Sequence, residues 1–174
     1  PHWATHDCRG EAWQWDGVWF EWLTLPRNEV APTTNAQSCV LRVVTQGQAV
    51  LIPADTGKEE ETALLQQYGE QLHSTVLLLG HHGSSGSSSS AWLNAVAPKL
   101  AIASSGFRNS YHHPTAAVQT RLRAHGIKLY RTDAQGSVAV LLDGDLQVLP
   151  SAGLGFWWQR KPFSTIDTVG FTAQ

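Results

Sequence analysis

The residues best suited to chemistry in this chain stand at the ends of short apolar runs. Val76–Leu79 is typical of a buried strand, and it is followed directly by Gly80–Gly83, a segment with two adjacent histidines. Asp55 follows another apolar run in the same way, and His113 precedes a proline. Imidazole nitrogen and carboxylate oxygen together suit a borderline divalent cation. This pattern indicates a metal or phosphate site.

The types of these residues suggest a role for each. Asp55, His81 and His82 are predicted metal ligands, because a carboxylate can also bridge two ions that clamp a phosphoryl group. His113 is the predicted catalytic residue, as a proton donor to a phosphate or a leaving group. The hydroxyl-rich loop that follows the histidine pair is predicted to bind substrate through Ser84 and Ser85.

Structural interpretations stand beside these functional ones. One of the paired histidines could be a hydrogen-bonded core residue, with the serine run a flexible linker. Asp55 could cap the following helix, which is compatible with metal binding. His113 could be a solvent-facing residue at a helix start. His112 is interpreted as a spacer, and the remaining histidines as surface residues: His2, His6, His73 and His125.

Composition sets the class of protein. The 174 residues are 42% hydrophobic and 15% charged, so the chain is expected to fold, and its length suits one domain. The formal charge of −2 excludes the broadly basic surface of a typical nucleic-acid binder, although a local patch or a bridging metal could hold a phosphate. No apolar run approaches the roughly 20 residues of a membrane helix. The start at Pro1 and the lack of methionine suggest a piece of a longer chain.

The two cysteines, Cys8 and Cys39, do not have zinc-knuckle spacing. They are predicted to be either two separate buried thiols or one disulfide. A disulfide would require an oxidising compartment and would tie the irregular segment near Cys8 to the strand that begins at Cys39.

The expected elements alternate along the chain. Residues 1–16 are expected to be irregular and 26–38 to form a polar loop, and the tail 151–174 cannot be assigned. Helices are expected at 58–68, 91–96 and 114–125, with Pro114 in the first helical position and Gly126 as the cap. Strands are expected at 18–25, 39–44, 49–52, 76–79, 100–103, 127–130, 138–142 and 146–149, with 39–52 as a hairpin.

This order predicts an α/β fold with polar groups after successive strands. Asp55 follows the third strand, the histidine pair follows the next, and His113 lies after the one beyond. Ligand sites of such sheets gather at the carboxyl ends of the strands. Three polar clusters at one edge therefore favour a metal or phosphate site there.

Several segments together resemble the metallo-β-lactamase-fold domain of the ComEC competence family. They are, in order, Ser38–Val43, Ala54–Glu59, Gly80–Ser84, His113-Pro114 and Tyr130–Asp133. By this resemblance Asp55 would be a metal-bridging aspartate, the histidine pair would supply a last ligand, and His113 would match an additional active-site histidine. Ala54 stands where the family usually has glycine, and the HxHxDH-like motif of the first half of the fold is absent.

The resemblance implies the C-terminal half of a metallo-β-lactamase αββα sandwich, with a partial domain at 1–150 and an aromatic and basic tail at 151–174. It implies a metal-dependent phosphodiesterase or nuclease of a DNA-uptake channel, with Mn²⁺ or Zn²⁺, two ions in the complete domain. Implied partners are DNA, the remainder of its own membrane channel protein and other competence proteins. The parent would lie in the bacterial inner membrane, with this domain on the extracytoplasmic side.

Two other functions compete with this one. The chain could belong to another hydrolase of the same fold that acts on a small ester or lactam. It could also be a degenerate domain that binds DNA or braces the channel without catalysis. With half a ligand set, the chain by itself is expected to bind metal weakly and to lack hydrolytic activity.

Overall fold

The computed structural model describes residue 8, residues 10–25 and residues 34–150. The predicted tail at 151–174, His2, His6 and most of the loop at 26–38 therefore lie outside the described residues. The strands are β1 Ala12–Trp15, β2 Val18–Leu23, β3 Val40–Thr45, β4 Gln48–Ile52, β5 Val76–Leu78, β6 Leu100–Ala103, β7 Lys128–Arg131, β8 Val138–Asp143 and β9 Asp145–Pro150. The helices are α1 Lys58–Tyr68, α2 Ser90–Val96, α3 Ala116–Ala124 and α4 Thr132–Gln135, with short 3-10 turns at Thr34–Gln37, Gly69–Leu72 and Gly80–Gly83.

The α/β class predicted from the sequence is confirmed by a seven-stranded mixed sheet. Strands β1 to β7 lie side by side in chain order. The first four pair antiparallel, and β4 to β7 pair parallel through helical connections. Strands β8 and β9 form a separate antiparallel hairpin. The parallel half of the sheet thus sends the carboxyl ends of β4, β5 and β6 to one edge.

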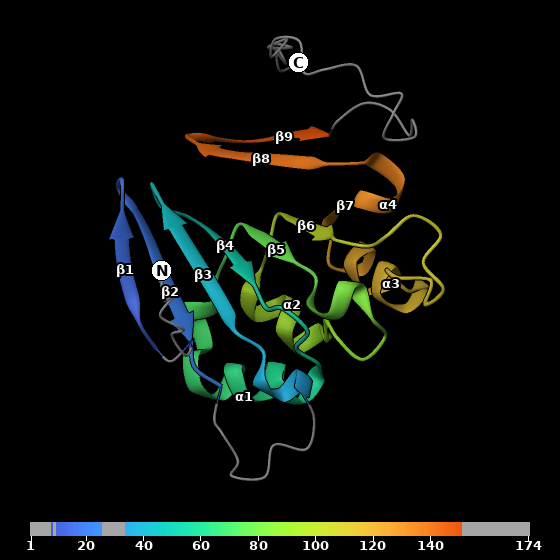
Figure 1. The fold of residues 1–174 in the computed structure, drawn as a ribbon, viewed down its shortest axis with the longest axis horizontal. Helices are drawn as coiled ribbons and strands as arrows, with labels where there is room; N and C mark the ends of the chain where they lie inside the picture. The colour runs from blue at the N-terminus through green and yellow to red at the C-terminus, as the bar shows by residue number, and fades with distance from the viewer. Residues whose placement is uncertain (1–7, 9, 26–33, 151–174) are drawn as a thin grey trace, which may run out of the picture.

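Figure 1 shows three layers: the hairpin β8–β9 on one face of the sheet and helices α1, α2 and α3 on the other. Side chains alternate along each strand, so the two faces carry separate apolar clusters. Leu51, Leu77 and Ala101 face the helical side, where Trp92 and Leu122 are also buried. On the opposite face of the sheet, a second set of buried side chains packs against the hairpin. The sheet contributes Val76, Leu100, Ile102 and Tyr130, and the hairpin contributes Val138, Val140, Leu142, Leu146 and Val148.

Two expectations about local structure were wrong. Residues 12–15 form strand β1, which pairs antiparallel with β2 across the turn at Asp16 and Gly17, so this part of the N-terminal segment is not irregular. Pro114 is not the first helical residue, because α3 begins at Ala116 with Thr115 as its N-cap. The alternation of polar and aromatic residues in β1 is short, and pairing with β2 stabilises it as a strand.

The C-terminus of α3 follows the expectation. Gly126 has a φ of +67°, a conformation that glycine adopts without steric cost. Its N–H donates to the Arg123 carbonyl at 3.0 Å, and the Ile127 N–H donates to the Leu122 carbonyl at 2.9 Å. This pair of bonds is a Schellman motif, which ends the helix and directs the chain into β7.

Candidate active site

The loop after β4 and the turn after β5 interlock through backbone contacts. The His81 N–H donates a hydrogen bond of 2.9 Å to the Ala54 carbonyl. Gly80 lies so close to this loop that a Cβ atom there would sit 2.8 Å from the carbonyl oxygen of Thr56. Glycine at position 80 therefore permits the contact that brings Asp55 and the histidine pair to the same place.

The loop before α3 is fastened to the same turn from the other side. The Thr115 N–H donates to the Gly83 carbonyl at 2.9 Å. Gly83 has a φ of +86°, and a Cβ there would lie 2.6 Å from the Cβ of Pro114. Pro114, whose peptide bond with His113 is cis, thus packs directly on the glycine. His113 is the residue before this contact, and its ring lies next to the ring of His81.

His82 and Asp55 face each other across the site. The His82 Nε2 lies 3.7 Å from the Asp55 Oδ1, and both side chains are about half exposed. The His82 Nδ1 lies 2.7 Å from the Ser104 carbonyl oxygen. A carbonyl only accepts, so Nδ1 carries a proton and donates it to Ser104, which leaves Nε2 as the ring nitrogen that faces the carboxylate. An imidazole nitrogen and a carboxylate oxygen are both atom types that bind divalent cations in proteins.

His81 borders an open cavity of about 360 Å³ that is also lined by Asp55 and Lys58. The centre of the His81 ring lies 6.4 Å from that of His82 and 5.9 Å from that of His113. Three imidazoles and one carboxylate from three loops therefore gather at the carboxyl edge of the sheet.

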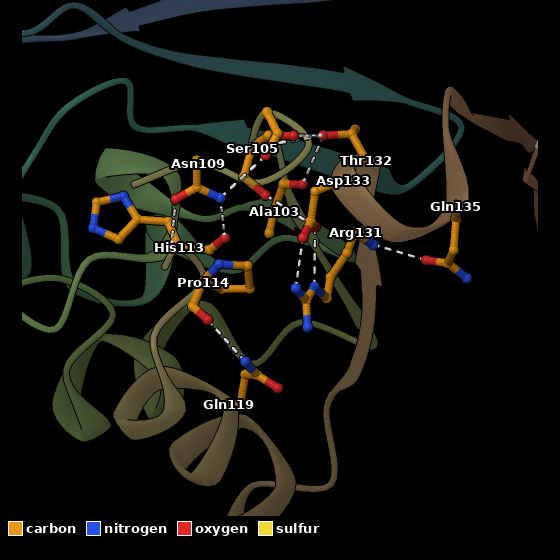
Figure 2. A network of polar contacts seen from close by, with 11 residues as sticks. Ala103, Ser105, Asn109, His113, Pro114, Gln119, Arg131, Thr132, Asp133 and Gln135 are labelled. Carbon is orange, nitrogen blue, oxygen red and sulfur yellow. Dashed lines mark hydrogen bonds and ion pairs between the residues drawn. The ribbon is translucent and has the colours of Figure 1, made fainter. Parts of the chain in front are cut away.

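His113 is fixed through its backbone by Asn109, as Figure 2 shows. The Asn109 Oδ1 accepts from the His113 N–H at 2.7 Å, and the Asn109 Nδ2 donates to the His113 carbonyl at 2.9 Å. Burial lowers the pKa of His113 below its ordinary value of 6.5, and the charges of His81 and His82 lower it further. The free imidazole is therefore mainly neutral at pH 7, and a bound anion would favour its protonated form.

The serine run is a structured loop, so its interpretation as a flexible linker is wrong. Ser87 and Ser88 are fully buried. The carboxylate of Glu61, on α1, accepts the backbone N–H groups of Ser88 and Ser89. The guanidinium of Arg121, on α3, donates to the carbonyls of three loop residues: Ser85, Ser87 and Ser88.

Burial raises the pKa of Glu61 above its ordinary value, while bonds from Ser89 and Ser88 and the charge of Arg121 lower it. The predicted substrate ligands differ in exposure: Ser85 is exposed, whereas Ser84 is half-buried and its Oγ accepts from the Gly86 N–H at 3.3 Å. Their role in substrate binding stays a prediction.

The structure also decides two of the structural alternatives. Asp55 is not the N-cap of α1, because that position belongs to Gly57, whose N–H is accepted by the Glu60 carboxylate at 2.7 Å. His82 is not a core residue, since its side chain is 54% exposed. The N-cap interpretation of Asp55 and the core interpretation of His82 are therefore both wrong.

The donor chemistry fits a divalent cation, but the set is small. Within the described part of the chain, no group of three or more His, Cys, Asp and Glu side chains is arranged to hold a metal ion. The Asp55 and His82 side chains lie 3.7 Å apart, and the rings of His81 and His113 lie next to them, so their role as metal ligands stays a prediction. The hydrogen bond from His82 to a backbone carbonyl is the kind of contact that orients metal-binding histidines.

Three residues that organise the site had no motif that identified them in the sequence. Glu61 was recognisable only as an acid in the first turn of a helix, and Arg121 only as a base near the end of another. Asn109, four residues before His113, looked like one polar residue of a loop. Their partners are distant in sequence or are backbone groups, so only the folded chain reveals them.

The two cysteines form a disulfide in the structure, with Cα atoms 5.7 Å apart. The sequence left open whether the cysteines are two separate thiols or one disulfide, and the structure shows the disulfide. It joins the segment before β1 to the start of β3.

In the described ranges, no helix has the length and apolar character needed to cross a membrane. No protein-family model matches the chain.

Three curated proteins match most of this chain in sequence. The chain is 50% identical over 157 residues to the competence protein ComA of Neisseria gonorrhoeae, which is 90% of this chain and 23% of the relative. It is 34% identical over 130 residues to ComE operon protein 3 of Bacillus subtilis, 75% of this chain and 16% of the relative. It is 32% identical over 161 residues to recombination protein 2 of Haemophilus influenzae, 91% and 20% respectively. The chain thus spans a quarter or less of the length of these relatives. Over most of its residues the chain is thus similar to a segment of three longer bacterial proteins, one of which is named a competence protein.

Proposed function

We propose that this chain is the phosphodiesterase part of a protein that takes up DNA for transformation. The observation that carries the proposal is the gathering of Asp55, His81, His82 and His113 from three separate loops at one sheet edge. The names of the competence relatives support the biological setting. In the same proposal, the chain belongs to the metallo-β-lactamase fold family, and its site binds a divalent ion, Mn²⁺ or Zn²⁺.

In this proposal Asp55 and His82 hold the ion, and His81 completes or flanks its shell. A bound divalent ion would supply Lewis-acid polarisation of the phosphodiester and activation of water. His113 approaches from the opposite loop and exchanges a proton with the phosphate or the leaving oxygen. The hydroxyls of Ser84 and Ser85 bind phosphate oxygens at the rim.

The test is cleavage of DNA by the full-length natural protein in which this sequence occurs, with Mn²⁺ or Zn²⁺. Asp55→Asn is expected to abolish cleavage, and His113→Ala to lower its rate by about 100-fold or more. His73→Ala serves as the control, because His73 is an exposed histidine at the amino end of β5. Cleavage of a small ester or lactam but not of DNA would contradict the proposal.

A second candidate is a domain that binds DNA without cleaving it. The finding that favours it is the lack of a three-ligand group within the described residues. Metal analysis of the full-length natural protein separates the two functions. Stoichiometric Mn²⁺ or Zn²⁺ that is lost in Asp55→Asn supports the phosphodiesterase, whereas DNA binding with no retained metal supports the binding domain.

A further inference from the structure

The loop between β6 and α3 exposes two aromatic rings beside the candidate site. Phe107 is 67% exposed and Tyr111 is 77% exposed. A single exposed aromatic residue on a protein surface is common and needs no explanation. Here two rings stand four residues apart in one loop, and the same loop carries His113. Such a group of exposed rings in the loop of a candidate site residue indicates a surface that contacts a ligand.

Each ring has a polar neighbour. The Tyr111 ring stacks on the His113 ring, with centroids 5.6 Å apart and an angle of 26° between the planes. The guanidinium of Arg108 lies 5.2 Å from the centre of the Phe107 ring. The loop therefore offers two aromatic faces, a cation beside one of them and an imidazole of the candidate site beside the other.

The loop that presents these rings is held by several hydrogen bonds. Asn109 donates to the Gly106 carbonyl at 3.1 Å in addition to its two bonds with His113. At the start of the loop, Thr132 accepts from the Ser105 N–H at 2.8 Å, and Ser105 in turn donates to Asp133 at 3.1 Å (Figure 2). Because the backbone is already fixed, a ligand that stacks on the rings loses little affinity to ordering of the loop.

Unpaired nucleotide bases fit this chemistry. Every base has a π-face that stacks on tyrosine or phenylalanine, and arginine supplies a charge for the adjoining phosphate. In a duplex these faces are covered by neighbouring bases, so a stacking surface selects single strands. With a net charge of −2, the chain does not have the broadly basic surface that binds nucleic acid through phosphates alone. Affinity for a nucleic acid would therefore come from stacking and from a few local cations.

We propose that Phe107, Arg108 and Tyr111 form a stacking surface for single-stranded nucleic acid, which delivers the strand to the site around His113. The delivery part rests on the proposed phosphodiesterase function, whereas the binding part does not. Affinity for single strands is the primary readout, and it is measured without divalent metal so that it is independent of cleavage.

The experiment is fluorescence anisotropy with a labelled oligothymidylate of about 12 nucleotides, within the range of known single-strand site sizes, in the presence of EDTA. The 174-residue chain is expected to bind this strand more tightly than its duplex. Phe107→Leu and Tyr111→Leu keep an apolar side chain without a π-face, and each is expected to weaken binding by about 5- to 100-fold. Tyr111→Phe keeps the ring and is expected to retain most of the affinity.

Two controls sharpen the result. Trp15→Leu removes an equally exposed ring, 72% exposed, from β1 at the far end of the sheet (Figure 1), and it is expected to leave binding unchanged. Arg108→Ala is expected to reduce the slope of log affinity against log salt by about 0.7, the value for one phosphate contact on a single strand. Circular dichroism of each variant checks that the fold is retained.

The contrary outcomes are distinct. Equal binding of single strand and duplex, no binding of the single strand, or no effect of both leucine variants would overturn the stacking surface. Loss of binding to another purified competence protein in these variants, with oligothymidylate binding unchanged, would also overturn it and would identify a protein-docking surface. If the wild-type full-length protein does not cleave DNA although the chain binds oligothymidylate through these rings, only the phosphodiesterase function would be overturned.

Discussion

At the residue scale, the candidate site is built on backbone that most side chains avoid. Ala54, His81 and His82 have φ values of 51°, 48° and 57°, in the left-handed region. Each such residue costs about 1–2 kcal/mol, and the contacts between the interlocked loops must hold it there. The left-handed φ at Ala54 also gives a physical reason why glycine is usual at this position in the resembling family.

The closest packing of these loops predicts the effect of a single methyl group. Gly83→Ala would combine a φ of +86° with a Cβ 2.6 Å from Pro114, so it is expected to lower the free energy of unfolding by roughly 2–4 kcal/mol. Gly47→Ala is the matched control, because Gly47 has a φ of +79° and open space around it. Its expected cost is only about 1 kcal/mol. Urea denaturation measures both, and equal costs would mean that the Pro114 contact is unimportant.

Metal binding is the second prediction at this scale. Isothermal titration of the chain with Zn²⁺ or Mn²⁺ is expected to show weak binding, because the proposed ligands Asp55 and His82 would provide only part of a coordination shell. His82→Ala is expected to weaken it by at least about 10-fold, and His73→Ala to leave it unchanged. Tight stoichiometric binding, or binding that survives His82→Ala, would show that the ligand set has been misassigned.

At the scale of elements, helices α1 and α3 hold the serine loop between them. Glu61 from α1 binds two backbone N–H groups, and Arg121 from α3 binds backbone carbonyls of the same loop. The Gly86 carbonyl also accepts from the Lys58 N–H at 2.9 Å, which joins the loop to the start of α1. The loop that follows the histidine pair is thus placed by two helices that are distant in sequence.

Removal of this anchor is expected to loosen the loop and destabilise the fold. Glu61→Ala leaves the buried N–H group of Ser88 and the partly buried N–H group of Ser89 without this acceptor, so the expected loss is about 2–4 kcal/mol of unfolding free energy. Thr62→Ala, an exposed change on the same helix that removes a hydrogen bond to the Lys58 carbonyl, is expected to cost less than about 1 kcal/mol. Thermal or urea unfolding compares the two, and faster hydrogen exchange at 84–89 in Glu61→Ala alone would locate the effect.

The junction of β7 and α4 predicts a dependence on pH. The hydrogen bonds from Arg131 to Asp133, at 2.6 and 3.0 Å, lower the pKa of the Asp133 carboxyl below its ordinary value of 3.8, with a further contribution from Ser105. A lowered folded-state pKa contributes stability above the ordinary pKa, and this contribution is lost as pH falls through the folded-state value. Asp133→Asn is therefore expected to lower stability by about 1–2 kcal/mol at pH 7.

The stability difference between wild type and Asp133→Asn is expected to shrink as pH falls below the ordinary pKa of 3.8, and to be lost once pH is below the lowered folded-state pKa, where the wild-type carboxyl is also neutral. Urea titrations at several pH values measure this difference. A difference that stays constant down to strongly acidic pH would show that the ion pair with Arg131 does not cause the stabilisation.

At the scale of the whole molecule, one covalent bond ties the antiparallel half of the sheet. The Cys8–Cys39 bridge spans 31 positions, and in the chain-entropy account a loop of this length contributes about 3–4 kcal/mol. Reduction, or the pair Cys8→Ser and Cys39→Ser, is expected to lower stability by this amount, as measured by urea unfolding with and without reductant. Identical unfolding curves, or free thiols in protein taken from its native compartment, would contradict a structural role for the bridge.

Much of the architecture was determined by the sequence alone. Apolar runs bounded by glycine, proline and paired polar residues predicted the strands near β3 to β9 and helices α1 and α2, because burial and turn chemistry act locally. Strand β1 and the start of α3 were misjudged, since pairing with β2 and the packing of Pro114 on Gly83 are tertiary effects. The sequence also identified Asp55, His81, His82 and His113 as residues to examine, because polar residues that follow buried strands are brought to one sheet edge.

Only the tertiary structure decided how these residues are held. It showed that the Ser104 carbonyl sets the tautomer of His82, that Asn109 fixes His113, and that Glu61 and Arg121 convert the serine run into a structured loop. These contacts join backbone atoms to side chains from other elements, and a backbone atom has no signature in the sequence. The identity of the chemical groups was therefore readable from the chain, whereas their distances and orientations arise from the packing of three loops against one another.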